Sequence, residues 1–280
     1  MKSDYSISEV APYINWIYFF HAWGMSGKPQ QEKERLQAEA EERLHRYADH
    51  YHTYAVFTLL PAYSDGDDIV VLENNENLKV NGENLKVSGE RIPCLRQQQE
   101  GSDFLCLADF ISPRSTFPTS HIGIFATSAD AGLETDFDGD PYEKMMMQLL
   151  ADRLAEATAE RLHEEVRKHY WGYAPDEQLT VSEMLQERWQ GIRPAVGYPS
   201  LPDTSLNFVI DQLLDLRQIG IRLTESGAMK PHASVSGLMM AHPQARYFTV
   251  GKIGDDQLRD YARRRGLPIE LMRRFLAANL

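Results

Sequence analysis

Two long stretches of the chain carry apolar residues at helical spacing. Between residues 30 and 51, Leu36, Ala40 and Leu44 stand four residues apart among charged neighbours, which predicts an amphipathic helix with a strongly charged outer face. Residues 141–170 hold an apolar stripe, no internal glycine, and proline only at the first position. Proline suits the first turn of a helix, so this stretch predicts a longer helix that serves as the central packing element.

Shorter apolar runs rich in β-branched and aromatic residues predict strands. These runs are 55–63, 67–72, 104–112, 121–129, 219–226, 233–241 and 245–253. Residues 13–23 predict a strand or a short buried helix, and short helices are expected within 182–189, 205–217, 255–266 and 268–280. No long linker divides the chain. We therefore predict one α+β domain over residues 1–280, with a twisted, mainly antiparallel sheet flanked by helices.

A short internal repeat lies within residues 73–91. The run ENLKVNG is followed directly by ENLKVSG. Two copies are too few for a solenoid, so we interpret the repeat as an exposed hairpin or strand pair.

Composition and net charge restrict the kinds of molecule that this protein is expected to bind. Of the 280 residues, 42% are hydrophobic and 25% are charged, which are ordinary values for a globular protein. The net charge of −12 disfavours nucleic acid and anionic membranes as partners. Two cysteines fit a reducing compartment, no apolar run approaches the roughly 18–20 residues of a membrane span, and the first residues lack the pattern of a signal peptide. We expect a cytoplasmic protein.

The C-terminal region departs from this acidic balance. From Arg246 to Arg274 there are eight basic and four acidic residues, a local charge of +4. Such a stretch is typical of a solvated helix face. A docking surface for an acidic partner is the alternative.

Motifs for common chemistries are absent or incomplete. His163 and His169 lie six residues apart, whereas a helical zinc motif needs a spacing of four. The calcium-loop-like run that starts at Asp136 has Pro141 where the turn needs glycine, and Met147 at its twelfth position where a glutamate is needed. The sequence contains no glycine-rich phosphate loop and no nucleophile elbow. We therefore predict no metal ligand and no catalytic nucleophile.

Several longer runs carry a resemblance to a known family. The strongest runs are Tyr170–Pro175 (YWGYAP), Glu187–Pro199 (ERWQGIRPAVGYP), Leu223–Gly237 (LTESGAMKPHASVSG) and His242–Gln257 (HPQARYFTVGKIGDDQ). Weaker ones are Val10–Trp16, LRQQ at 95–98, Cys106–Pro113 and ADRLAEA at 151–157. They follow the family's order and extend over nearly the whole chain. The chain resembles the C-terminal activation domain of cobalamin-dependent methionine synthase.

The resemblance implies a repair function. Domains of this family bind S-adenosylmethionine. When the cobalamin has been oxidised to the inert cob(II) state, flavodoxin donates an electron and S-adenosylmethionine supplies the methyl group that restores methylcobalamin. Such a domain contributes no known nucleophile and acts by positioning. The chain would then be a component of a methyltransferase and not a complete catalyst alone.

The resemblance also implies ligand contacts in the ERWQGIRPAVGYP run. Arg193 offers a planar fork for the ligand carboxylate, and the following proline stiffens its direction. Glu187 would hold the ammonium group or brace Arg193. Ala195 and Gly197 are small enough for close approach of the backbone to the adenine edge.

Aromatic residues complete the implied site. Tyr198 would line the path to cobalamin and contact the sulfonium. Tyr247 and Phe248 occupy the position of an aromatic pair beside the ligand. Because neighbouring residues of a strand point to opposite faces, we expect Tyr247 to line the groove and Phe248 to contribute backbone or core contacts.

One position departs from the family. Asn15 stands where the family has an aspartate that contacts the ligand. Asparagine still accepts hydrogen bonds, but it lacks the negative charge. We therefore expect weaker binding of a cationic ligand, by about 1–2 kcal/mol.

The chain lacks the D-x-H-x-x-G signature of a cobalamin module. We therefore expect cobalamin to act here only through a partner protein, as in a split methionine synthase whose cobalamin-binding subunit meets this chain. The family also implies a flavodoxin-like electron donor, for which the stretch from Arg246 to Arg274 is a candidate docking surface. Two alternatives remain: a regulatory module that binds S-adenosylmethionine without methyl transfer, and a reactivase of another corrinoid methyltransferase.

Overall fold

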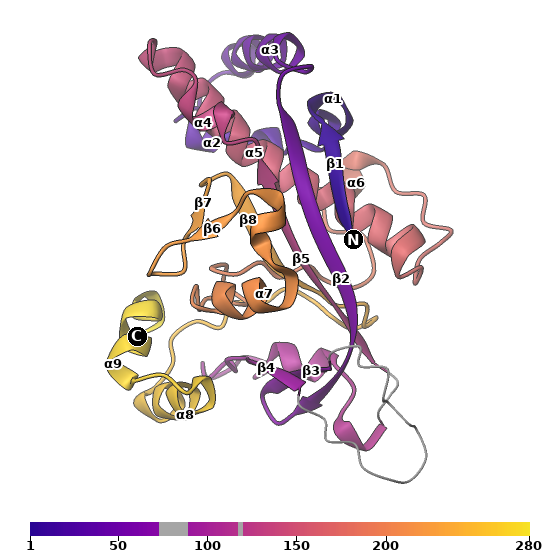
Figure 1. Ribbon diagram of the computed structural model, residues 1–280, viewed down its shortest axis with the longest axis vertical. Helices are drawn as coiled ribbons and strands as arrows, with labels where there is room; N and C mark the ends of the chain where they lie inside the picture. Colours follow the sequence, from indigo (N-terminus) through magenta and orange to yellow (C-terminus); the bar gives the residue numbers. More distant parts are fainter. Residues whose placement is uncertain (73–88, 117–119) are drawn as a thin grey trace. The chain divides into compact units, whose positions relative to one another are not determined.

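The computed structural model describes residues 1–72, 89–116 and 120–280, which form α-helices and β-strands (Figure 1). The strands are β1 (Lys2–Ser6), β2 (His52–Asp65), β3 (Asp68–Leu72), β4 (Gly89–Pro93), β5 (His121–Ala129), β6 (Arg222–Leu223), β7 (Met229–Lys230) and β8 (Ser234–Met239). The helices are α1 (Ile7–Val10), α2 (Trp16–Ala22), α3 (Gln30–Arg46), α4 (Gly132–Thr135), α5 (Pro141–Glu165), α6 (Val181–Met184), α7 (Leu206–Leu214), α8 (Asp255–Arg265) and α9 (Ile269–Phe275).

The main sheet has the strand order β4-β3-β2-β5-β8, with β1 paired to β2 off this path. The pairs β1–β2, β2–β3 and β3–β4 are antiparallel, and β6 and β7 form a separate antiparallel pair. The predicted α+β domain with a mainly antiparallel sheet flanked by helices is confirmed. Residue contacts divide this fold into two compact units.

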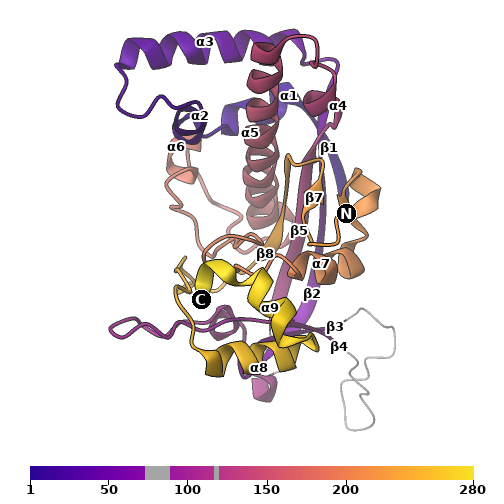
Figure 2. The same ribbon diagram turned by 90° about the vertical axis from the view of Figure 1, so that its left-hand side faces the viewer.

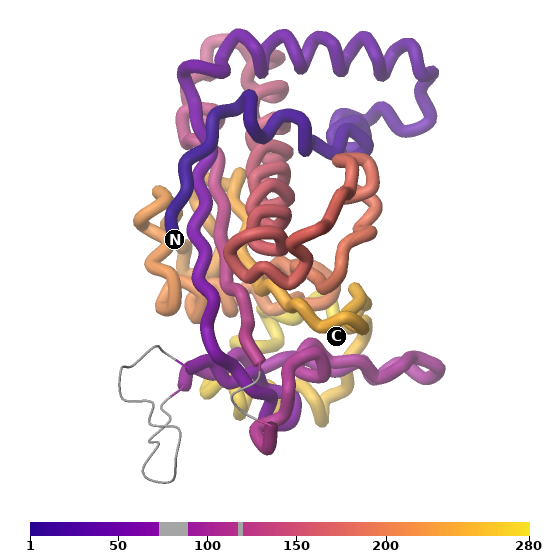
Figure 3. Tube along the Cα trace, turned by 90° about the vertical axis from the view of Figure 1, so that its right-hand side faces the viewer, coloured from indigo at the N-terminus to yellow at the C-terminus, as the bar shows by residue number. Residues whose placement is uncertain are grey.

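The first unit consists of Met1–Phe57, Phe125–Trp189 and Leu214–Ser236. Its centre is the predicted long helix, α5, which runs beside the strands β1, β2 and β5 (Figure 3). The hydroxyl of Thr158 on α5 donates to the Thr53 hydroxyl on β2 at 2.7 Å, and Thr127 on β5 donates to the Ala155 carbonyl at 2.9 Å. Buried threonines thus join helix and sheet without leaving unsatisfied polar groups.

The start of α5 explains the calcium-like run. The Asp140 side chain accepts hydrogen bonds from the backbone N–H groups of Tyr142 and Glu143 and so caps the helix. Within the described ranges, His, Cys, Asp and Glu side chains form no cluster of three or more that could hold a metal ion. Nor does the described part of the chain contain a helix with the length and apolarity needed to cross a membrane.

The predicted amphipathic helix is α3, and it lies across the N-terminal end of α5 (Figure 2). Leu36, Ala40 and Leu44 are buried, as their spacing predicts. An ion pair of 2.7 Å between Arg43 Nε and Glu143 Oε2 joins the two helices. Residues 13–23, which predicted a strand or a short helix, begin at the end of a 3₁₀ turn (Ala11–Tyr13) and then form the short helix α2.

The second unit consists of Thr58–Ile124, Gln190–Leu213 and Gly237–Leu280. The predicted closing helices are α8 and α9, which pack on a buried cluster formed by residues of both helices, of the segment before α8, and by Leu95. Its members are Leu95, Val250, Ile253, Leu258, Tyr261, Ala262, Met272 and Leu276.

Three strand predictions were wrong in whole or in part. Residues 104–112 form a 3₁₀ turn at Leu107–Phe110, because the Asp109 carboxylate accepts the Cys106 N–H at 2.8 Å and offers the backbone a local partner. Residues 245–253 join no strand within the described part of the chain, and several of their backbone groups bond to side chains or to a loop. Of 219–226, only β6 is a strand. The predicted repeat hairpin falls mostly within 73–88 and lies outside the described residues.

Candidate functional site

Six of the eight predicted ligand contacts belong to the second unit, and the fold gathers them on two segments. The loop that carries Arg193, Ala195, Gly197 and Tyr198 runs beside the end of β8. Backbone N–H groups of Ile192 and Met240 each donate to the other's carbonyl at 2.9 Å, and the Leu238 N–H donates to the Pro194 carbonyl at 3.0 Å. An isolated bridge pairs Ala195 with Gly237. The loop is therefore held like an additional edge strand.

The second segment reaches this loop through Tyr247. The Tyr247 hydroxyl accepts a hydrogen bond from the Arg193 backbone N–H at 2.9 Å. Both residues are half-buried. The contact uses the main chain of Arg193, so the direction of the loop is fixed independently of the guanidinium.

Gly197 sits at a tight turn of the loop. Its φ of +88° is the left-handed conformation that glycine adopts at little cost. The Gly197 N–H donates to the Leu201 carbonyl, and the Leu201 N–H donates to the Tyr198 carbonyl, both at 2.8 Å. This turn leaves Tyr198 50% exposed, so an aromatic face is available at the surface of the site.

Ser200 fixes Phe248, a contact that sequence reasoning missed. The buried Ser200 hydroxyl accepts the Phe248 N–H at 3.2 Å and donates to the Phe248 carbonyl. The Val250 N–H also donates to the Pro199 carbonyl at 2.9 Å. One side chain thus occupies both backbone groups of Phe248 in place of a neighbouring strand. The serine directly follows the GYP run, and that position was the only signal for it in the sequence.

Asp203 is a second residue that the sequence did not reveal. It is 1% exposed, and its carboxylate accepts four hydrogen bonds. Oδ1 takes the Ser205 N–H at 2.9 Å and the Ser205 hydroxyl at 2.6 Å, whereas Oδ2 takes the Tyr261 hydroxyl at 2.9 Å and Arg265 Nε at 3.2 Å. Burial, followed by the negative charge of Asp203, raises the pKa of Tyr261 well above its usual value, so this phenol stays a donor. The network ties α8 to the loop after Tyr198.

The other two predicted contacts belong to the first unit. Asn15 precedes α2, and its side-chain oxygen accepts the Ile17 N–H at 3.2 Å, which makes it the N-cap of that helix. Glu187 is exposed and has a φ of +58°, a conformation uncommon for residues with a side chain. Their roles toward a ligand stay predictions.

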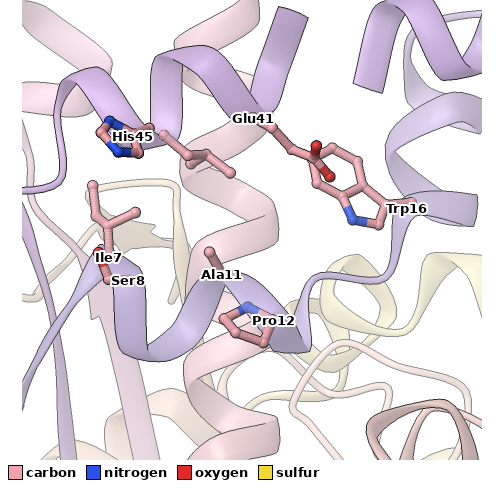
Figure 4. A pocket seen from close by; sticks show the side chains of 8 residues that line it. Ile7, Ser8, Ala11, Pro12, Trp16, Glu41 and His45 are labelled. Atoms are coloured by element: carbon pink, nitrogen blue, oxygen red, sulfur yellow. The ribbon is translucent and has the colours of Figure 1, made fainter. Parts of the chain in front are cut away.

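A pocket of about 340 Å³ lies in the first unit, bordered by α1, the following turn, α2 and α3 (Figure 4). It is lined by Ile7, Ser8, Ala11, Pro12, Trp16, Glu41, Leu44 and His45. Trp16 directly follows Asn15 in the sequence, but none of the eight predicted ligand contacts lines this pocket. It is a mostly apolar pocket with a carboxylate, an imidazole and an indole at its walls.

The basic stretch from Arg246 to Arg274 is less open than its composition indicated. Arg264 is largely buried and pairs with Asp68 at 2.5 Å and with Asp260 at 2.7 Å. Arg265 is buried against Asp203. These two cations are structural and cannot serve a docking surface. Arg259 and Arg274 are exposed, and Arg263, also exposed, pairs with Asp260.

Comparisons with known proteins place the chain in one family. The family described as "Vitamin B12 dependent methionine synthase, activation domain" matches residues 6–266. A solved crystal structure of the MetH reactivation domain bound to AdoHcy superposes with a TM-score of 0.90 at 38% sequence identity. The match covers 100% of this chain and 90% of that one. The chain therefore belongs to the activation-domain family of vitamin B12-dependent methionine synthase.

Proposed function

We propose that this chain binds S-adenosylmethionine and acts as the reactivation component of a cobalamin-dependent methionine synthase, presenting the sulfonium methyl group to a cobalamin held by a partner subunit. The observation that carries the proposal is the relative solved with AdoHcy, which is similar over the full length of this chain. S-adenosylhomocysteine is what remains of S-adenosylmethionine once its methyl group has been transferred. A site that holds one is therefore built to hold the shared adenosyl and amino-acid parts of the other.

The residues of the second unit fit such a ligand. The guanidinium of Arg193 matches the ligand carboxylate as a bidentate donor. The turn at Gly197 and the small Ala195 would let the backbone approach a planar base closely, and the exposed ring of Tyr198 would contact a sulfonium. S-adenosylmethionine supplies the methyl group, and these residues bind and orient it. Their contribution to rate is the alignment of the methyl carbon with the incoming nucleophile.

Calorimetry and methyl transfer test this proposal together. The purified chain is titrated with S-adenosylhomocysteine and S-adenosylmethionine, and is then incubated with reductant, a cob(II)alamin-loaded methionine synthase partner and methyl-labelled S-adenosylmethionine. We expect saturable binding and label on the cobalamin. Absence of binding contradicts the proposal. Binding without transfer to this partner supports the alternatives, a regulatory module or the reactivase of another corrinoid protein, and transfer to a different corrinoid protein selects the second.

Asn15→Asp should tighten binding of S-adenosylmethionine about 5- to 30-fold, which corresponds to about 1–2 kcal/mol. Aspartate is also a good N-cap, so the bond to the Ile17 N–H is retained and α2 keeps its start. Calorimetry with the cationic ligand measures the gain. The control is Gln31→Glu, which adds the same charge near the start of α3 and should leave affinity unchanged. Unchanged or weaker binding by Asn15→Asp would remove Asn15 from the site.

We further propose that a flavodoxin-like donor docks on the exposed cations of α8 and α9. Charge reversal at Arg259 and Arg274 together should slow cobalamin reduction at low ionic strength by about tenfold, because steering between opposite charges raises association rates. The measurement is the reduction rate against salt concentration. Thermal unfolding should be unchanged, since both side chains are exposed. A rate that responds neither to salt nor to these reversals would refute docking at this surface.

A further inference from the structure

Within the described residues, the segment that carries Tyr247 and Phe248 pairs with no strand, although its sequence favours β structure. At Thr249 its backbone meets a hairpin formed by residues 96–106, hereafter the 96–106 hairpin. Arg96 and Cys106 pair at its base, and the Gln97 N–H donates to the Leu105 carbonyl at 3.0 Å. Hairpin and segment both belong to the second unit.

Arg96 anchors the base of this hairpin. Its guanidinium donates to Asp67 Oδ1 at 2.6 and 2.9 Å and to both Asp109 oxygens at 2.8 Å. A further bond of 2.7 Å reaches the Phe104 carbonyl within the hairpin. Burial opposes ionisation of Asp109, yet hydrogen bonds from Arg96 and from the Cys106 N–H hold the pKa of this carboxyl below its usual value. The hairpin therefore starts from a fixed, charge-assisted base.

Glutamine side chains join the hairpin to Thr249, to Gly254 and to the start of α8. Gln97 Nε2 donates to the Thr249 carbonyl at 2.9 Å, and Gln97 Oε1 accepts the Leu105 N–H at 3.1 Å. Gln98 Oε1 accepts the Gly254 N–H at 2.6 Å. In the opposite direction, Gln257 binds both backbone groups of Arg96, at 2.7 and 2.9 Å. An amide side chain has a donor group and an acceptor group. These glutamines can therefore bind backbone groups that a neighbouring strand would otherwise pair.

Of these glutamines, Gln97 binds the residue that is nearest in sequence to the predicted ligand contacts. It holds Thr249, which follows Phe248 directly, while Ser200 holds Phe248 from the other segment. Because Tyr247 directly precedes Phe248 and Thr249, these two anchors restrict the backbone from which its hydroxyl reaches the Arg193 N–H. We propose that Gln97 is a positioning residue for the S-adenosylmethionine site, acting through Thr249 on Tyr247 and Arg193. This inference rests on the proposed function.

Two substitutions at Gln97 test the proposal. Gln97→Met removes both hydrogen bonds without adding charge, and Gln97→Glu keeps the acceptor for Leu105 but loses the donor to Thr249. Each should weaken S-adenosylhomocysteine binding about tenfold in calorimetry. The matched control is Gln99→Glu, an exposed position of the same hairpin, which should bind like the wild type. Thermal midpoints should stay within a few degrees, because Arg96 still fixes the hairpin.

A double-mutant cycle separates positioning from a general loss of structure. In a Tyr247→Phe background the hydroxyl that reaches Arg193 is already gone, so Gln97→Met should cost less than threefold. Amide hydrogen exchange gives a second readout: the Arg193 amide should exchange faster in Gln97→Met, with Ile192 and Met240 unchanged. A full tenfold loss that persists in the Tyr247→Phe background contradicts the inference. So does wild-type affinity in both Gln97 variants. If the wild type itself fails to bind, the proposed function falls, and this inference falls with it.

Discussion

Arg193→Ala should lower the affinity for S-adenosylhomocysteine about 100-fold, which corresponds to about 2.7 kcal/mol. The side chain is proposed to donate two charge-assisted hydrogen bonds to the ligand carboxylate, and each such bond contributes more than a neutral one. Main-chain contacts help to hold the loop: the Arg193 N–H donates to the Tyr247 hydroxyl, and Ile192 pairs with Met240. Truncation of the side chain leaves those bonds in place.

Arg193→Lys distinguishes charge from geometry at this position. Lysine keeps the positive charge but cannot present the planar fork, so we expect a loss of about tenfold. The control is Arg217→Ala, an exposed arginine of the first unit, which should bind normally. Calorimetry with S-adenosylhomocysteine measures all three variants. Equal affinity of Arg193→Ala and the wild type would remove Arg193 from the carboxylate contact.

Regular elements with a strong local pattern could be predicted from the sequence. The helices α3 and α5 follow from periodic apolar residues and from capping, which are properties of neighbouring positions. Residues 245–253 could not be assigned correctly in this way. Their side chains are of types that favour strands. Their backbone, however, bonds to distant side chains: Thr249 to Gln97, 152 residues away, and Phe248 to Ser200, 48 residues away. A side chain that replaces a strand leaves no periodic signal.

In the candidate site, too, some residues could be predicted from the sequence and others could not. The runs that resemble the family identified the loop with Arg193 and the segment with Tyr247, and the fold joins the two by a hydrogen bond. The residues that hold these segments carry no signal of charge or spacing, although Gln97 lies within the LRQQ run. The basic stretch is the clearest example, because a count of charges ignores distant partners. Arg264 pairs with Asp68, 196 residues away, so a cation that adds to a patch in the sequence is neutralised in the fold.

A single change at Asp203 should strongly destabilise the fold. Asp203→Ala removes four hydrogen bonds and leaves Arg265, whose side chain is 8% exposed, without its carboxylate. Breaking a buried ion pair from one side costs about 3–5 kcal/mol, because the remaining charge stays buried and unpaired. Urea denaturation of the chain measures the loss. Asp255→Ala is the matched control: its pair with Arg273 is 64% exposed on the aspartate side, so we expect at most about 1 kcal/mol.

Asp203→Ala should also weaken ligand binding. Asp203 lies two residues beyond Leu201, whose backbone closes the turn at Gly197 and Tyr198, so loosening the loop should weaken S-adenosylhomocysteine binding at temperatures where the variant is still folded. The double variant Asp203→Ala/Arg265→Met removes the stranded charge and should recover part of the stability, so that the two single losses add to more than the double loss. Recovery of binding with it would show that the network acts on the site by fixing the loop. If Asp203→Ala were no more destabilising than Asp255→Ala, the buried network would not be what ties α8 to this loop.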